Sequence, residues 1–305
     1  MTSELSTGYL QTEFRNGWWP YLPGRGESLE ATAWCAIACR NDEKLAAQAV
    51  RHIISRQNAD GGWSTAPDVD GGRSDWSSGL ALLALNILQR QPSIDQRLSA
   101  QIKSCQERGF KKLTAQRADV ITDLTRVGMM VMQGPDFDYP RGWPWAADTY
   151  NWVEPTAYAL LAIKSGPYAK EKRYQQVVSE AQQYLFDKAC SVGGWNFGAP
   201  RTLGADWPPM PPPTALALIA MQDVKHKQID KALGYLRSLS GPSVTSLMGQ
   251  SLSLIARSLH GEDTGLNAAA SAPAPPFSGG ENLATIAMAT IAANLHKEGN
   301  PLKLA

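Results

Sequence analysis

Two glutamates stand at the start of apolar, alanine-rich stretches, where a carboxyl group could act as a proton donor. Glu154 opens "EPTAYALLAI" (154–163) and Glu30 opens "EATAWCAIA" (30–38). Burial among apolar side chains disfavours the charged form of a carboxyl group, so its pKa rises and it can serve as a general acid near neutral pH. Glu154 is therefore the principal candidate for a general acid, and Glu30 is a weaker candidate.

Aromatic residues lie close to both glutamates in the sequence. The face of an aromatic ring stabilises a cation by about 2 kcal/mol or more when water is excluded. A proton donor among such rings could start a reaction that passes through a carbocation. The residues that we expect to line an apolar cavity are Trp34, Trp76, Trp143, Trp145, Trp152, Tyr158 and Trp207.

A purely structural interpretation of the glutamates competes with the catalytic one. An acidic residue beside Pro is typical of a helix N-terminus, because Pro fixes φ and the carboxylate interacts with the positive end of the helix dipole. Glu281 occupies the same position in a third stretch. A residue that only starts a helix is needed in every repeat, whereas a proton donor is needed once. The recurrence of Glu therefore favours the structural interpretation. A helix N-terminus also favours the ionised form, which opposes a raised pKa.

No other set of side chains has the spacing of a metal or cofactor site. Cys35 and Cys39 are one helical turn apart, but the histidines are scattered, so we expect free thiols that pack in the core. The acidic pairs of "PDVDGG" (67–72) and "GPDFDYP" (134–140) lie between turn-forming residues and predict solvated loops. The sequence predicts neither a metal nor a cofactor.

A short pattern recurs along the chain and indicates a duplication. Glu is followed by Ala three and eight residues later after Glu30, Glu154 and Glu281, and "PPPTALALIA" (211–220) keeps both alanines. The flanking segments pair as well. We therefore expect one domain over 1–305, built from two copies (16–110 and 141–260) and closed by a C-terminal helix at 281–297.

Helical spacing of apolar residues dominates the chain, and strand signals are nearly absent. In each pair of helices the first is rich in Ala and Leu, and the second is amphipathic and charged. This alternation predicts an all-α fold with a buried inner ring and an outer ring, an α/α toroid of about 10–11 helices. The segment 261–280 has nothing to bury and predicts an exposed connection or a flap over a cavity mouth. The predicted helices are 29–40, 44–57, 77–90, 94–108, 117–132, 153–165, 169–189, 213–223, 227–239, 243–259 and 281–297.

The segment "RHIISRQNADGGW" (51–63) places Gln57, Gly61 and Trp63 in a Q-x-x-x-G-x-W arrangement, and "KACSVGGWNFG" (188–198) repeats it in degraded form around Trp195. This motif resembles the repeat of squalene-hopene and oxidosqualene cyclases and, more loosely, of prenyltransferase β-subunits. A Gln here can donate to the free carbonyls of its own helix end and accept from the next helix. The Trp would cover that junction, and Gly61 allows the sharp return. The motif predicts the fold and supplies no chemistry.

The resemblance also implies where a class II cyclase would carry its acid, within D-x-D-D-T-A or D-C-T-A at the start of an inner helix. In "GGWNFGAPRTLGADWPPMPPPTA" (193–215) the acidic positions are Met210 and Pro211–Pro213, and only Thr214 and Ala215 match. After the first G-G-W, Asp75 is kept but Ser77 stands at the acid position. When the segment E-P-T-A (154–157) is aligned with D-C-T-A, Glu154 takes the position of the catalytic acid.

Two functions stay open. One is a terpene cyclase-like enzyme, an isomerase or intramolecular transferase that protonates an isoprenoid chain. The other is a non-catalytic toroid that holds such a ligand or docks a partner. Full-length cyclases have two toroid domains, so a second copy or a partner domain could complete the cavity.

The composition excludes other classes of partner. The 29 basic and 28 acidic residues nearly balance, and no basic cluster is interleaved with aromatics, which excludes nucleic acid. The first residues do not form a signal peptide, and the longest apolar runs span about half a membrane. We expect a cytoplasmic protein that touches a membrane only at its surface, if at all.

Overall fold

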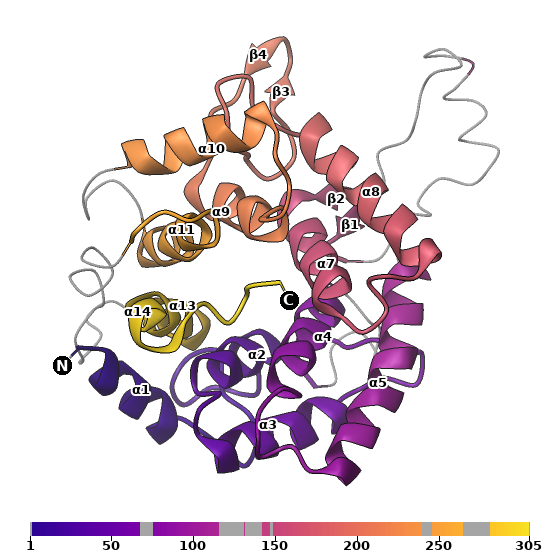
Figure 1. Cartoon of the computed structure of the whole chain (residues 1–305), viewed down its shortest axis with the longest axis vertical. Coiled ribbons are helices and arrows are strands. Elements are labelled where there is room, and N and C mark those ends of the chain that lie inside the picture. Colours follow the sequence, from indigo (N-terminus) through magenta and orange to yellow (C-terminus); the bar gives the residue numbers. More distant parts are fainter. Residues whose placement is uncertain are drawn as a thin grey trace.

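The fold is an α/α toroid, as the sequence predicts. The computed structural model describes residues 2–67, 76–115, 131, 142–146, 149–239, 246–264 and 281–304. Its inner helices follow one another around a ring, and the last packs against the first (Figure 1). These inner helices are α2 (Leu29–Ala38), α4 (Ser77–Leu88), α7 (Val153–Ser165), α9 (Pro211–Ala220), α11 (Leu247–Leu259) and α13 (Leu283–Ala293).

Outer helices cover this ring, each against one or two inner helices. They are α1 (Thr2–Thr12) on α13, α3 (Glu43–Ser55) on α2 and α4, α5 (Gln96–Ala115) on α4, α8 (Lys172–Asp187) on α7, and α10 (Lys227–Ser238) on α9. The short α14 (Leu295–Glu298) follows α13.

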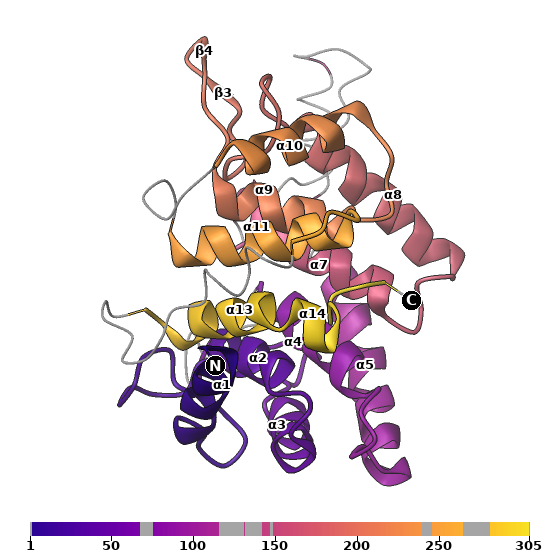
Figure 2. The ribbon, with the colours of Figure 1, turned by 60° about the vertical axis from the view of Figure 1, so that its left-hand side comes forward.

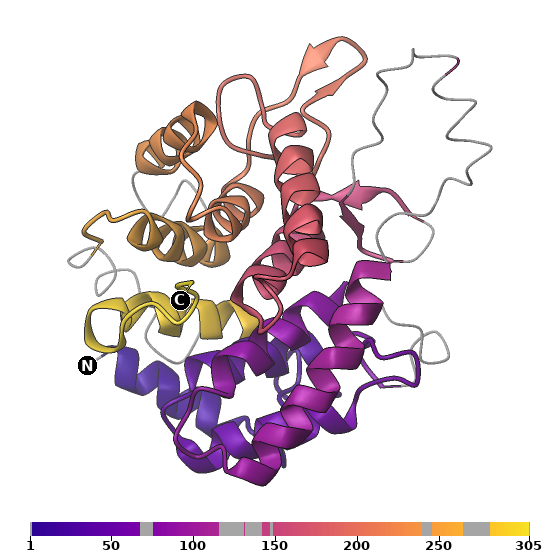
Figure 3. The same ribbon diagram turned by 45° about the vertical axis from the view of Figure 1, so that its right-hand side comes forward.

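Two short antiparallel hairpins complete the described secondary structure. One joins β1 (Trp143–Pro144) to β2 (Asn151–Trp152), and the other joins β3 (Arg201–Thr202) to β4 (Ala205–Asp206). The β3–β4 hairpin projects from the body of the molecule (Figures 2 and 3).

The two layers follow from the composition of the helices. Every residue of α4, from Ser77 to Leu88, is buried, which a helix flanked on all sides requires. Small residues let the inner helices approach closely: a Cβ on Gly79 would lie 3.1 Å from the backbone nitrogen of Ala159 in α7. Outer helices bury only one face, as α3 does with Leu45 and Ile53 among others.

The predicted helices correspond to observed ones with shifted ends. The expected closing helix at 281–297 is α13 with α14. Helix α1 escaped prediction because "TSELSTGYLQT" is mostly polar, although its Leu10 is fully buried. The predicted helix 117–132 and the connection 261–280 lie outside the described residues except for 131 and 261–264. The division into duplicated halves stays a prediction.

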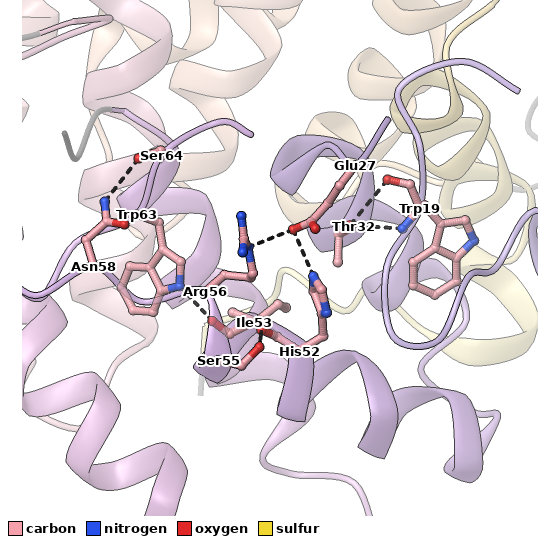
Figure 4. Close-up of polar contacts among 10 residues, drawn as sticks. All are labelled: Trp19, Glu27, Thr32, His52, Ile53, Ser55, Arg56, Asn58, Trp63 and Ser64. Carbon is pink, nitrogen blue, oxygen red and sulfur yellow. Dashed lines mark hydrogen bonds and ion pairs between the residues drawn. The ribbon is translucent and has the colours of Figure 1, made fainter. Parts of the chain in front are cut away.

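One pair of hydrogen bonds recurs where an outer helix gives way to an inner helix. The indole Nε1 of Trp63 donates to the carbonyl of Ile53 near the end of α3, at 2.8 Å (Figure 4). The backbone N–H of Trp63 donates to Ser78 Oγ at the start of α4, at 2.9 Å. We call this unit a tryptophan clasp. The other clasps are Trp19 with Leu10 and Thr32, Trp143 with Leu113 and Thr156, and Trp195 with Leu185 and Thr214.

Gln57 has different partners from those that we expected. Its side-chain amide donates to the carbonyl of Gly61 at 2.7 Å and to that of Cys105, within α5, at 2.8 Å. Its own carbonyl oxygen has no partner among the described residues. Gln57 therefore links the turn at Gly61, which follows α3, to the outer helix α5. Gly61 has φ +94°, and a Cβ there would lie 2.8 Å from the carbonyl of Arg108, so both conformation and space require glycine.

The carboxyl ends of the inner helices are tied together on the opposite face. Lys164 at the end of α7 donates to the carbonyl of Ala220 in α9 at 2.9 Å. The C-terminal tail crosses the ends of α9 and α11: Gln222 donates to the carbonyl of Leu302, and Asn300 donates to that of Ile255. Leu302 is buried. The C-terminal tail therefore covers the carboxyl ends of α9 and α11.

Thr156→Val tests the clasps because it removes the acceptor of the buried Trp143 N–H while keeping the shape of the side chain. We expect a loss of about 1–3 kcal/mol in the free energy of unfolding, measured by urea denaturation, because a buried donor loses its partner. Thr149→Val, at an exposed position, is the control. Equal stability of the two variants would contradict a structural role for the clasp.

Candidate functional site

The site lies on the amino-end face of the ring, where the inner helices begin. Glu30 occupies the first turn of α2 and Glu154 the first turn of α7, and α4 lies between these helices in the ring. Both side chains are partly buried. One turn further along, Trp34 and Tyr158 meet with ring centroids 6.3 Å apart. The two helices therefore bring their glutamates and aromatic rings to one place.

Four rings form the base of this site. Trp76, just before α4, lies 5.7 Å from the ring of Tyr158 and 4.7 Å from that of Trp145. Trp34 is fully buried, and Tyr158 is 4% exposed. We call Trp34, Trp76, Trp145 and Tyr158 the aromatic floor. Offset and edge contacts of this kind suit the quadrupoles of the rings.

Both glutamates hold their protons to unusually high pH. Burial raises the pKa of Glu30 to about 7. Burial and, to a smaller extent, the charge of Glu30 raise the pKa of Glu154 to about 7. The charge of Glu30 therefore disfavours ionisation of Glu154, and near neutral pH each carboxyl is partly protonated.

The glutamates do not act as side-chain caps of their helices. Ser28 caps α2 by accepting from the backbone N–H of Ala31, and α7 has no side-chain cap. The dipole at a helix N-terminus lowers the pKa of a carboxyl, and desolvation raises it. Here desolvation is the larger effect at both positions.

Tyr158 lies close to both carboxyl groups. Burial is the largest cause of the raised pKa of its phenol, and the charges of Glu30 and Glu154 raise it further. The nearby indole N–H of Trp34 acts in the opposite direction. The hydroxyl therefore stays protonated and can donate a hydrogen bond.

The other candidate residues lie elsewhere. Trp143 and the repeat residues Trp63 and Trp195 are held in clasps, so Trp143 does not join the aromatic floor as expected. Trp152 lies at the rim with its ring 6.2 Å from that of Phe197. Trp207 follows the β3–β4 hairpin and is 56% exposed, away from the floor.

Among the described residues, the starts of α4, α9 and α13 do not carry an aspartate at the acid position of the cyclase motif. Ser77 is buried and donates to the carbonyl of Trp63, and Asp75 lies outside the described residues. Met210 precedes three prolines at the start of α9. Glu281 comes just before α13, whose cap is Asn282.

The Thr-Ala pair that matches the cyclase motif has a structural explanation. Thr32, Thr156 and Thr214 are the clasp acceptors for Trp19, Trp143 and Trp195. The recurrence of Trp before each Glu-x-Thr-Ala or Pro-Pro-Thr-Ala segment was the sequence signal that could have revealed this unit.

A polar cluster fixes the approach to α2. One oxygen of Glu27 lies 2.8 Å from His52 Nε2 and 3.1 Å from Arg56 Nε (Figure 4). His52 and Arg56 belong to the end of α3. This tie holds the segment directly before Glu30 against the outer layer.

The interior of the ring is packed beneath the site. The described residues of α2, α4, α7, α9 and α13 are buried along almost their whole length. The aromatic rings that we expected to line a deep cavity, such as Trp34, are enclosed by neighbours.

Neither a metal centre nor a membrane span is found in the described part of the chain. There, no three His, Cys, Asp or Glu side chains converge as ligands, and no helix is both long and apolar enough to cross a bilayer. Cys35, Cys39, Cys105 and Cys190 are free and buried. Burial raises the pKa of Cys39 and of Cys105 to about 12, so these thiols are unreactive.

No protein-family model matches the chain, and no curated protein sequence matches it. Solved structures do share its fold. An α-1,6-mannanase of Salegentibacter sp. HEL1_6, in complex with α-1,6-mannotriose, is 12% identical over 96% of this chain and 98% of its own, with a TM-score of 0.64. A rhamnosidase from Klebsiella oxytoca is 12% identical over 97% of this chain and 63% of its own, with a TM-score of 0.62.

A type II terpene cyclase from Scytonema also shares the fold. It is 14% identical over 100% of this chain and 80% of its own, with a TM-score of 0.54. These likenesses show the α/α toroid that glycosidases and a terpene cyclase have in common. They do not show membership of the squalene-hopene cyclases.

The raised pKa values predict a pH-dependent stability. Ionising Glu154 in the folded state is costly, so its contribution is favourable below 4.5 and is lost as pH rises through about 7. Glu154→Gln removes this loss. As pH rises from 4.5 to about 7, we expect the free energy of unfolding of the variant to increase by about 1–3 kcal/mol relative to that of the wild type. Urea unfolding at several pH values measures this difference.

Glu43→Gln, on the exposed side of α3, is the matched control and should follow the wild type. If the free energies of unfolding of Glu154→Gln and the wild type changed with pH in parallel, the Glu154 carboxyl would titrate as it does in water, and the raised pKa would be contradicted.

Proposed function

We propose that the protein is an enzyme that protonates an uncharged substrate at the amino-end face, with Glu154 and Glu30 as the proton-donating pair. The pair itself carries this proposal: two carboxyls with pKa values of about 7 stand one helical turn before Trp34 and Tyr158, whose rings are in contact. A general acid works best when its pKa lies near the working pH. Strongly perturbed carboxyls in one place are typical of active sites.

An isoprenoid is the substrate that the aromatic floor favours. The rings of Trp34, Trp76 and Tyr158 lie next to the acid pair and offer π faces to a carbocation. The fold is shared with a type II terpene cyclase, and the repeat motif resembles that of such enzymes. Because the ring interior is packed, the chain of the isoprenoid would lie across the amino-end face. A second copy or a partner domain could cover it there.

A glycoside is the second candidate, and the pairing of carboxyls favours it. Glycoside hydrolysis uses one protonated and one ionised carboxyl on either side of the scissile bond. With pKa values of about 7, Glu30 and Glu154 can supply these two states near neutral pH. Several structures with this fold are glycosidases.

Conversion of defined substrates tests the proposal. Purified protein is incubated with linear isoprenoids, with and without a terminal epoxide, and with aryl glycosides, and products are followed by mass spectrometry. An isomer of the substrate indicates cyclisation, and addition of water indicates hydrolysis. Glu154→Gln should lower the rate by about 10²–10⁴-fold, the contribution of a general acid, whereas Glu43→Gln should not.

Failure to convert either class of substrate would contradict an enzyme. A lipid retained by the protein in native mass spectrometry would then support a binding module, and the measured mass would reveal a second copy.

The dependence of rate on pH separates the two substrates. Protonation of an alkene or epoxide needs only the acid form, so the rate should be level at low pH and fall above about 7. Hydrolysis needs one acid and one base, so its profile should be bell-shaped. A rate that rises steadily with pH would contradict both.

A further inference from the structure

The β3–β4 hairpin carries an exposed leucine at its tip. Leu203 and Gly204 form the turn between the two strands, and the side chain of Leu203 is fully exposed. The hairpin projects from the body of the molecule (Figures 2 and 3). An isolated Leu on a flat surface is ordinary. At the end of a projection, the same side chain is the first to meet whatever the protein approaches.

The backbone at this leucine is strained. Leu203 has φ +52° and Gly204 has φ +81°, so both central residues of the turn are in the left-handed region. Turns of this kind prefer Asn, Asp or Gly at the first position, because the Cβ of other residues crowds the backbone there. The fold thus keeps an unfavourable residue where its side chain gains no burial. An outlier of this kind points to a function outside the fold.

A second exposed apolar side chain stands further from the tip. Trp207 is 56% exposed, and its backbone N–H donates to the carbonyl of Pro200 at 2.9 Å. This bond continues the strand pairing beyond Arg201 and Asp206. At about 3.3 Å per residue, the backbone of Trp207 lies about 10 Å behind the tip. Leu203 and Trp207 are therefore set at two different heights along the hairpin.

The charged groups between these two side chains are paired. Arg201 Nε lies 3.7 Å from Asp206 Oδ1, and Arg201 Nη2 donates to the carbonyl of Gly204 at 3.3 Å. Ser191 donates to Asp206 Oδ2 at 3.0 Å. The turn that contains Val192, which is 71% exposed, therefore lies beside the hairpin and adds a further apolar side chain.

The shape and chemistry of the hairpin suit a lipid bilayer better than a protein surface. A stable protein interface buries about 800 Å² on each partner, far more than the tip of a two-stranded hairpin presents. A bilayer accepts single side chains, and interfacial elements enter about 5–10 Å into the boundary of headgroups and acyl chains. At that depth Leu203 reaches the acyl chains, and Trp207 lies among the headgroups, where tryptophan is enriched. Arg201 then lies near the lipid phosphates.

We propose that the β3–β4 hairpin is a membrane-docking element, in which Leu203 inserts among the acyl chains of a phospholipid bilayer and Trp207 anchors at its surface. Burial of so few apolar side chains gives a weak and reversible association. Docking of this kind does not depend on any activity at Glu30 and Glu154.

Sedimentation of the full chain with vesicles tests the proposal. We expect the wild type to partition onto phosphatidylcholine vesicles, with or without phosphatidylserine, because apolar burial drives binding. Leu203→Asn should weaken this partition by about tenfold or more, the value of burying one leucine. Asn is favoured at this turn position, so the variant should be at least as stable as the wild type in urea unfolding. Lost binding would therefore not be due to unfolding.

Tyr150→Ser is the matched control, because it removes an exposed ring from the segment between β1 and β2 and should bind as the wild type does. The proposal is overturned if the wild type binds neither kind of vesicle, or if Leu203→Asn binds equally well. Binding that requires phosphatidylserine and disappears at high salt also overturns it, since charge would then drive the association. A wild-type dimer that Leu203→Asn dissociates, without vesicle binding, would assign the hairpin to a second copy instead.

Discussion

The architecture depends on the tryptophan clasp, which joins the end of an outer helix to the start of an inner one. Each clasp uses two donors of one residue, as Trp63 does with Ile53 and Ser78. It thus satisfies a carbonyl at the end of one helix and fixes where the next begins. Because the same unit stands at the starts of α2, α4, α7 and α9, these helices begin on the same face. The glutamates of α2 and α7 lie on that face.

The glutamates stand where two electrostatic effects oppose each other. The helix N-terminus stabilises a carboxylate, while the surrounding apolar residues destabilise it. Burial prevails at Glu30 and Glu154, and at Glu154 the charge of Glu30 adds to it. The packing of the toroid is thereby the main cause of the raised pKa of both groups. The same scaffold can carry out different reactions because such a site is set by few residues.

The sequence predicted the layers well, because alternation between alanine-rich and amphipathic segments reflects burial directly. Glu30 and Glu154 were chosen as candidates from sequence because a lone acid before an apolar helix is conspicuous, and their role as acids stays a proposal. Their interaction was not foreseeable, because it depends on α4 separating α2 from α7 in the ring. Trp143 and Trp207 were misplaced for a similar reason: a tryptophan that holds a helix end or lies exposed after a hairpin looks the same in a sequence as one in a cavity.

The central claim is that two coupled carboxyls stay protonated well above their ordinary pKa. Infrared difference spectroscopy of the carboxyl stretch, comparing the wild type with Glu30→Gln and Glu154→Gln across pH, tests it most directly. The account predicts that each variant loses one protonated carboxyl that persists between 4.5 and about 7. It also predicts that Glu154 titrates at lower pH in Glu30→Gln, because the charge of Glu30 is gone. Spectra in which both groups ionise near 4.5 would contradict it.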